Sequence, residues 1–194
     1  MDPKTLEAYD QRAPDYAREW QYQAPPSDMH ALLLRHFSPG PTLDVGCGSG
    51  RDLAWLGAQG FDALGVDASA GLLTQARTMH PGLRFALLSL PELKGLQAGA
   101  FQNVLCETVI MHLPAEQIAA ATRRLRELLR PGGTLYLSWR VTPDASIRDA
   151  AGRLYSAFDK RLVREALGSV EVLLDDESVS VSSGKRVHRL IVRA

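Results

Sequence analysis

A glycine-rich turn is the part of this sequence best suited to chemistry: residues 44–50 read Asp-Val-Gly-Cys-Gly-Ser-Gly. Glycines let a backbone turn tightly and approach a ligand more closely than any side chain would permit. A dinucleotide fingerprint that starts at Gly46 needs glycine at position 51, where Arg51 stands, and the Gly-Lys-Ser/Thr of a phosphate P-loop is not present. An acid before the first glycine favours a ligand with an ammonium group, to which Asp44 would bind. The alternative is a carboxylate that only braces its own loop.

A second acid, Asp67, follows Asp44 by 23 residues and stands at the predicted end of a strand. In nucleotide-binding sheets, an acid about 20 residues beyond the glycine turn binds the ribose hydroxyls. Asp67 therefore predicts a ligand with a nucleoside sugar, and the adjacent Ala68 belongs to the same candidate site. The alternative role is a negative charge at the N-terminus of a helix capped by Ser69.

The elements that must position these acids alternate between strand and helix. Residues 2–23 have a loosely helical spacing that Pro14 should interrupt, and Ser27 is expected to cap the next helix. The clearest helix is predicted over residues 116–130, because its apolar residues follow one face. Short apolar runs predict five strands, at residues 42–45, 61–66, 83–88, 101–106 and 134–139. Strands and helices in this order predict a parallel sheet with helices on both faces.

The last part of the chain follows a different pattern. Residues 170–174, 179–181 and 187–192 are predicted to be strands, with a turn at Asp175-Asp176-Glu177. An antiparallel hairpin at the edge of the sheet would accommodate them. We therefore expect one domain over residues 1–194. Its predicted parts are a helical lid (1–38), a cofactor-binding core (41–140), and a C-terminal helix with antiparallel strands (141–194).

The composition limits the partners of the protein. Its 22 basic and 22 acidic residues cancel, so no overall field favours nucleic acid or an anionic membrane. Two cysteines make neither a disulfide framework nor a zinc pattern. The first ten residues have no apolar run, so neither a signal peptide nor a membrane anchor is predicted. We expect a cytoplasmic monomer or homodimer that binds a small molecule and no metal.

From Leu43 to Trp139 the sequence resembles the class I S-adenosylmethionine-dependent methyltransferases. Residues 43–50 resemble the motif that holds the methionine portion of the cofactor, and residues 65–69 the motif whose acid binds ribose. Residues 101–114 and 128–137 resemble the motifs around the fourth and fifth strands. The resemblance implies a Rossmann-like sheet of seven mostly parallel strands with an antiparallel last strand. It also implies S-adenosylmethionine as cofactor and S-adenosylhomocysteine as product.

The resemblance also implies which residues bind the cofactor. Leu88 stands where the family usually has an acid that contacts the adenine amino group, so the backbone of Leu88 and Ser89 is expected to contact the base. The Asn/Asp-Pro-Pro-aromatic motif of nucleic-acid amino-methylating members is not present, nor is the acid cluster of metal-assisted members, and the small-molecule branch remains. The predicted cofactor-binding residues are Asp44, Gly46, Cys47, Gly48, Gly50, Asp67, Ala68, Leu88, Ser89, Cys106 and Tyr16.

Methyl transfer by in-line displacement mainly needs alignment and exclusion of water. A general base is needed only for an acceptor that is protonated at working pH. His112, just beyond the fourth strand, is the candidate base, with a packing role as the alternative. Tyr9, Tyr16 and Trp20 supply aromatic faces that attract a sulfonium, or else they pack on the core.

Three functions remain open from the sequence alone. The first is a small-molecule methyltransferase. The second, a nicotinamide-dependent oxidoreductase, is disfavoured by Arg51 and by the acid at Asp44. The third is a cofactor-binding protein without catalysis, for which the departure at Leu88 leaves room. Arg51 either pairs with the cofactor carboxylate or is a solvated surface arginine. The basic segment 182–188 either lies near a substrate entrance or is a hairpin turn with a solvated face.

Overall fold

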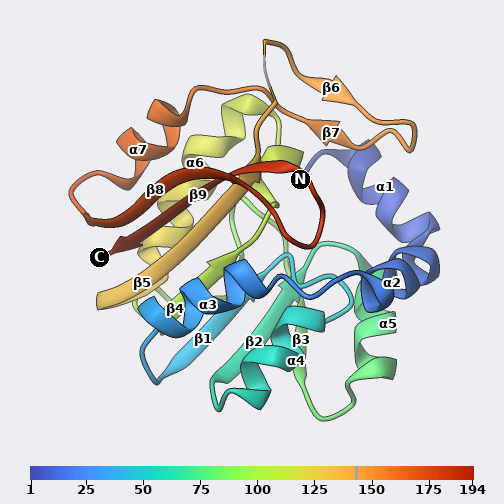
Figure 1. Cartoon of the computed structure of the whole chain (residues 1–194), viewed down its shortest axis with the longest axis horizontal. Helices are drawn as coiled ribbons and strands as arrows, with labels where there is room; N and C mark the ends of the chain where they lie inside the picture. Colours follow the sequence, from blue (N-terminus) through green and yellow to red (C-terminus); the bar gives the residue numbers. More distant parts are fainter. Residues whose placement is uncertain (143) are drawn as a thin grey trace.

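The computed structural model describes residues 1–142 and 144–194, and its centre is a seven-stranded sheet (Figure 1). The strand order is β3-β2-β1-β4-β5-β9-β8. Strands β1 to β5 pair in parallel, and β9 runs antiparallel to both of its neighbours. The bounds are β1 Pro41–Val45, β2 Asp62–Asp67, β3 Arg84–Leu87, β4 Phe101–Cys106, β5 Leu129–Arg140, β8 Glu171–Val179 and β9 Arg186–Arg193. The predicted Rossmann-like sheet with an antiparallel C-terminal hairpin is confirmed.

Strand order reverses between β1 and β4. The chain runs from β1 outward through β2 to β3, then crosses to β4 and continues to β5 on the other side. In open parallel sheets this reversal leaves a crevice at the carboxyl ends of the strands, where ligands bind. The glycine turn follows β1 at this crevice, and Asp67 is the last residue of β2.

Helices cover both faces of the sheet and bury its side chains in two cores. Met29, Leu33, Leu53 and Leu56, on α3 and α4, pack against one face, and α6 and α7 pack against the other. Neighbouring residues of one strand divide between the cores, since Leu105 faces the first core whereas Val104 and Cys106 face the second. The bounds are α3 Ser27–His36, α4 Arg51–Ala58, α5 Ala70–Met79, α6 Ala115–Glu127 and α7 Lys160–Leu167.

Two short N-terminal helices and a small hairpin lie together beside the sheet (Figure 1). The helices are α1 Pro3–Gln11 and α2 Ala13–Tyr22, and the hairpin strands are β6 Ile147–Arg148 and β7 Leu154–Tyr155. Arg148 donates to both carboxylate oxygens of Asp2 at 2.8 and 2.9 Å, and the Leu154 amide donates to the Thr5 hydroxyl at 2.8 Å. These contacts fix α1 against the hairpin. The helix break expected from Pro14 is confirmed, because Pro14 lies in the first turn of α2.

Three expectations about element boundaries are wrong. Ser27 does not cap α3; it is the helix's first residue, and Pro26 precedes it without a side-chain cap. The helix expected to reach residue 130 ends earlier, since α6 ends at Glu127 and β5 begins at Leu129. Strand β5 includes the Pro-Gly-Gly segment, and its pairing with β4 is irregular there. The remaining error concerns residues 175–181, which form neither the turn predicted at residues 175–177 nor the separate strand predicted at residues 179–181.

Residues 175–177 lie inside the continuous strand β8, and the chain reverses instead between Val179 and Arg186. Their three acidic side chains suggested a turn, but each residue pairs with a basic or apolar residue of β9. Asp176 lies opposite Arg189 and Glu177 opposite His188. The His188 ring nitrogens lie 2.7 Å from Asp175 Oδ1 and 3.5 Å from Glu177 Oε1, so these side-chain contacts join the two strands. The cap that Ser69 was expected to make on α5 is confirmed, with its hydroxyl accepting from the Leu72 amide.

No helix within residues 1–142 and 144–194 is both long enough and apolar enough to cross a membrane.

Candidate active site

A cavity of about 390 Å³ opens at the carboxyl ends of β1, β2, β4 and β5, where the strand order reverses. Its size falls in the range of small-molecule sites. Helices α1 and α2, the β6–β7 hairpin and the turn between β8 and β9 contribute to its walls. The cavity-lining residues used below are Tyr9, Trp20, Asp44 to Ser49, Arg51, Asp52, Asp67 to Ser69, Leu88, Ser89, Glu107 to Val109, Met111, His112, Arg140, Arg153, Tyr155 and Lys185.

The glycine turn after β1 packs against the end of β2. The amides of Gly46 and Cys47 donate to the Val66 carbonyl at 2.7 and 3.1 Å. Gly46 and Gly48 have φ values of +76° and +54°, a region that residues with a Cβ rarely adopt. A Cβ at Gly46 would lie 2.3 Å from a Val109 methyl carbon. Glycine is therefore required here by backbone conformation and by the close approach of Val109, in the segment that follows β4.

Asp67 bridges the glycine turn and the next helix. One carboxylate oxygen accepts the Gly48 amide at 2.9 Å and the other accepts the Ser69 amide at 2.8 Å. Each carboxylate oxygen has a second lone pair, so the group can still bind a diol that enters the cavity. Burial raises the pKa of this carboxyl, although backbone donors oppose the shift.

Asp44 has an unsatisfied oxygen. The side chain is almost fully buried, and no hydrogen-bond donor among the described residues reaches its Oδ2. Burial, with Asp52 and Asp67 nearby, raises the pKa of this carboxyl well above its usual range. A buried carboxylate without a donor is costly, so a ligand that brought N–H groups would stabilise it. Burial also raises the pKa of the neighbouring Cys47 thiol, which disfavours the thiolate.

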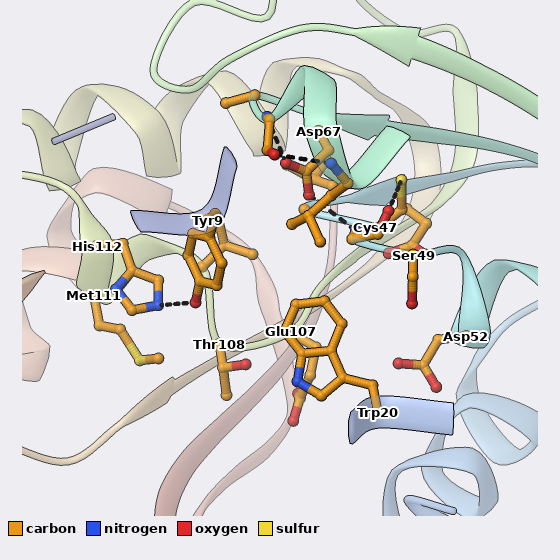
Figure 2. Close-up of a pocket in the computed structure, with 18 of the residues that line it drawn as sticks. Tyr9, Trp20, Cys47, Ser49, Asp52, Asp67, Glu107, Thr108, Met111 and His112 are labelled. Carbon is orange, nitrogen blue, oxygen red and sulfur yellow. Dashed lines mark hydrogen bonds between the residues drawn. The ribbon is translucent and has the colours of Figure 1, made fainter. Parts of the chain in front are cut away.

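His112 and Tyr9 form a hydrogen-bonded pair on the opposite wall (Figure 2). The Tyr9 hydroxyl lies 3.1 Å from His112 Nε2, and His112 Nδ1 lies 2.6 Å from the Leu154 carbonyl. A carbonyl only accepts, so Nδ1 carries the proton, and Nε2 accepts from Tyr9. Burial lowers the pKa of His112 to about 4 and raises that of Tyr9. Both groups are therefore neutral at pH 7.

Arg153 of the hairpin completes this wall. Its guanidinium lies 5.4 Å from the Tyr9 ring, 5.0 Å from the Tyr16 ring and 5.9 Å from the Tyr155 ring. It also pairs with Asp149 at 2.7 Å. Cation–π contacts of this kind order aromatic side chains, and here they hold the α1 side of the cavity against the hairpin.

The floor between the two walls is formed by Glu107 and Thr108, directly after β4. Glu107 hydrogen-bonds to the Ser138 hydroxyl, and burial raises the pKa of its carboxyl. Thr108 has a φ of +54°, which is unusual for a β-branched residue. Its amide is held by the Ser138 carbonyl and hydroxyl at 3.2 and 3.0 Å. Strain retained at a cavity floor is typical of functional sites.

Comparison with known proteins agrees with this geometry. A family model described as a methyltransferase domain matches residues 42–133. Over 72% of its length, this chain is 32% identical to the ubiquinone biosynthesis O-methyltransferase of Xanthomonas axonopodis pv. citri (strain 306). A protein of the same name from Methylococcus capsulatus is 39% identical over half of the chain. The chain belongs to the methyltransferase family.

The relatives are longer than this chain. The alignments cover 64% of the Xanthomonas protein and 41% of the Methylococcus protein. Among solved structures, 1,6-didemethyltoxoflavin-N1-methyltransferase of Burkholderia thailandensis, with bound S-adenosylhomocysteine, is similar over 98% of this chain and 87% of its own. Its TM-score is 0.77 and its identity 23%. The [4+2]-cyclase SpnF, with a TM-score of 0.71 and 15% identity over 96% of this chain and 94% of its own, shares the fold.

Most residues predicted to bind the cofactor line the cavity of this methyltransferase-family chain. Those at the cavity are Asp44, Gly46, Cys47, Gly48, Asp67, Ala68, Leu88 and Ser89, and His112 faces it as well. Gly50, Cys106 and Tyr16 are not among the lining residues. Gly50 precedes α4 with a φ of +85°, Cys106 faces the core, and the Tyr16 ring packs behind Tyr9 and Trp20.

Several residues that line the cavity are not among the site residues predicted from the sequence. Glu107 immediately follows a predicted strand, and its position at a strand end could have identified it. Arg140 likewise ends β5. Arg153 and Tyr155 come from a segment without a clear period, and only its folding onto α1 brings them to the cavity. Arg51 lies at the cavity but is paired with Asp52 at 3.2 Å.

Proposed function

We propose that this protein transfers a methyl group from S-adenosylmethionine to a small-molecule acceptor. The observation that carries this proposal is the buried Asp44 oxygen beside the glycine turn, which no donor in the described part of the chain reaches. Unlike a dinucleotide or a phosphate bound at a P-loop, S-adenosylmethionine combines an ammonium group for Asp44 with a ribose for Asp67. A nicotinamide dinucleotide would place a pyrophosphate against the turn, close to two carboxyl groups.

The residues present suit the parts of the cofactor. Asp44 would accept from its ammonium group, and Asp67 would accept from the ribose hydroxyls through its two free lone pairs. The adenine would lie along Leu88 and Ser89, with Leu88 offering apolar contact. Bound S-adenosylmethionine supplies a methyl group on a sulfonium, whose thioether leaves without acid assistance. Trp20, whose ring lies over Gly48, would shield this region from water.

The Tyr9–His112 pair would serve the acceptor. The two relatives are named O-methyltransferases, which favours a hydroxyl as the group that is methylated. Because the Tyr9 proton points to Nε2 of His112, the Tyr9 oxygen can accept the acceptor's proton while its own proton passes to His112. His112 would take up that proton at Nε2 and would carry a positive charge after transfer.

Calorimetry with S-adenosylhomocysteine and with NAD tests the cofactor assignment. We expect the wild-type protein to bind S-adenosylhomocysteine and not NAD, and we expect Asp67→Ala to weaken that binding at least tenfold. Asp62→Ala is the matched control, because Asp62 lies at the exposed opposite end of the same strand, β2. Binding of NAD alone would overturn the proposal.

A screen for methyl transfer then separates catalysis from binding. We expect radiolabelled methyl from S-adenosylmethionine to appear on at least one member of a broad panel of hydroxylated small molecules. Tight S-adenosylhomocysteine binding without transfer to any of them would instead support a protein that binds the cofactor without catalysis.

A further inference from the structure

The charges lining the cavity are divided between its two ends. Most of the carboxyl groups lie near the glycine turn or at the strand ends beside it: Asp44, Asp52, Asp67 and Glu107, with Glu19 on α2 as the exception. Arg140 and Lys185 line the cavity on the side of β5 and β9. In the described part of the chain neither makes an ion pair, whereas Arg51 pairs with Asp52 and Arg153 with Asp149. Two lining cationic side chains are thus left without carboxylate partners among the described residues.

Secondary structure places Arg140 and Lys185 together. Arg140 is the last residue of β5, and its cross-strand partner is Val187 of β9, two residues beyond Lys185. The Arg140 amide donates to the Met111 sulfur at 3.0 Å, so the residue is adjacent to the segment that carries His112. The two cations therefore lie on the acceptor side of the site, beyond the cofactor residues of β1 and β2.

The Arg140 guanidinium is also ordered. Its Cζ lies 5.0 Å from the centre of the Tyr155 ring, and the residue is half-buried. Guanidinium groups that stack on an aromatic ring keep their donors free at the edge, in a geometry that matches a carboxylate. Tyr9, Tyr155 and Met111 give the neighbouring wall flat or adaptable apolar surfaces, which suit a planar ring.

We propose that the acceptor is a planar compound bearing a carboxylate, which Arg140 binds with assistance from Lys185. This inference rests on the proposed methyltransferase function, and it names the class of molecule that the site would methylate. A negative acceptor would also be attracted to a positively charged sulfonium, so binding of the cofactor and of the acceptor would reinforce each other. Arg140 acts here as a specificity-determining residue.

Titration of the protein saturated with S-adenosylhomocysteine tests this inference without turnover. The probes are 3-hydroxybenzoate and 3-hydroxybenzamide, which have nearly the same shape and differ in charge. We expect the acid to bind at least tenfold more tightly than the amide. Arg140→Gln should reduce that difference to less than threefold and leave the affinity for S-adenosylhomocysteine unchanged. Lys185→Gln should reduce it less, because Lys185 is more exposed.

Arg123→Gln is the control, since Arg123 is an exposed cation on α6 outside the cavity lining. Equal affinity for acid and amide, or binding of neither, would overturn the inference while the cofactor proposal stood. A loss of S-adenosylhomocysteine affinity in Arg140→Gln would also overturn it, because Arg140 would then serve the cofactor. Failure of the wild-type protein to bind S-adenosylhomocysteine would overturn the proposed function and this inference with it.

Discussion

At the scale of single residues, Asp44 shows how a ligand site is maintained at a cost to the folded protein. Its side chain is 3% exposed and one oxygen has no donor among the described residues. Its raised pKa means that the folded protein holds a proton that the unfolded chain releases. The stability linked to this group is therefore fully present below the ordinary pKa of an aspartate and is lost as pH rises through the folded value.

Asp44→Asn should separate stability from binding. Without the ionisable group, the ligand-free protein should gain free energy of unfolding relative to wild type, by about 1 kcal/mol or more at pH 8 and by less at pH 5. Its affinity for S-adenosylhomocysteine should fall at least tenfold, because an amide does not attract an ammonium group as a carboxylate does. Chemical unfolding at both pH values and calorimetry measure the two effects.

Asp62→Asn, a substitution at an exposed carboxylate, provides the comparison. The interpretation of Asp44 would be wrong if its amide variant bound S-adenosylhomocysteine as tightly as wild type.

At the scale of elements, the contact between α1 and the short helix η1 (Ile110–His112) assembles the acceptor side of the cavity. Tyr9 and His112 are 103 residues apart in sequence and 3.1 Å apart in space. The Asp2–Arg148 pair holds α1 against the hairpin, and Arg153 of the hairpin lies over the Tyr9 ring. The position of α1 therefore depends on the hairpin, and the position of the Tyr9 hydroxyl depends on α1.

Tyr9→Phe should test the pair. Loss of the hydroxyl that donates to Nε2 removes a bond to the neutral imidazole, so the pKa of His112 should rise from about 4 while burial keeps it below 6.5. NMR of histidine-labelled protein measures this titration and the Nδ1–H tautomer. For a hydroxyl acceptor found by screening, the methyl-transfer rate should fall at least tenfold with little change in cofactor affinity.

Tyr22→Phe is the control, because Tyr22 is 82% exposed on α2. A Tyr9→Phe variant with a wild-type transfer rate would refute the proton relay.

The lowered pKa of His112 also determines how the stability of the protein depends on pH. Between pH 6.5 and about 4, His112 binds a proton in the unfolded chain but not in the folded protein. The contribution of His112 to the free energy of unfolding therefore declines as pH falls through that range.

At the scale of the whole molecule, segments distant in sequence close one cavity. Helices α1 and α2 supply one side, and the turn between β8 and β9 reaches them, since Gln23 donates to the Ser182 carbonyl at 2.8 Å. The cavity walls thus come from both ends of the chain, around a floor made by the middle of the sheet. A ligand that filled this cavity would contact segments from both ends of the chain.

S-adenosylhomocysteine should therefore protect distant segments together. At a concentration 100 times its dissociation constant, a ligand that binds only the folded protein adds about 2.7 kcal/mol to the free energy of unfolding. Hydrogen exchange should slow in residues 44–69, and also in α1, α2 and residues 180–185. Exchange in α7, which lies outside the cavity lining, is the internal control. Protection confined to residues 44–69 would show that the N-terminal helices do not cover the cofactor.

The sequence by itself determined the order of the five parallel strands and the place of the glycine turn and Asp67, because periodicity, caps and glycines act on neighbouring residues. It failed where local chemistry had two meanings: three acids in β8 resembled a turn, and only their pairing with β9 shows them to be a strand. Tertiary structure alone decided which side chains meet. It brought Tyr9 to His112 and Arg140 close to Lys185, and it turned Tyr16 and Cys106 away from the cavity, because such contacts depend on how distant elements pack.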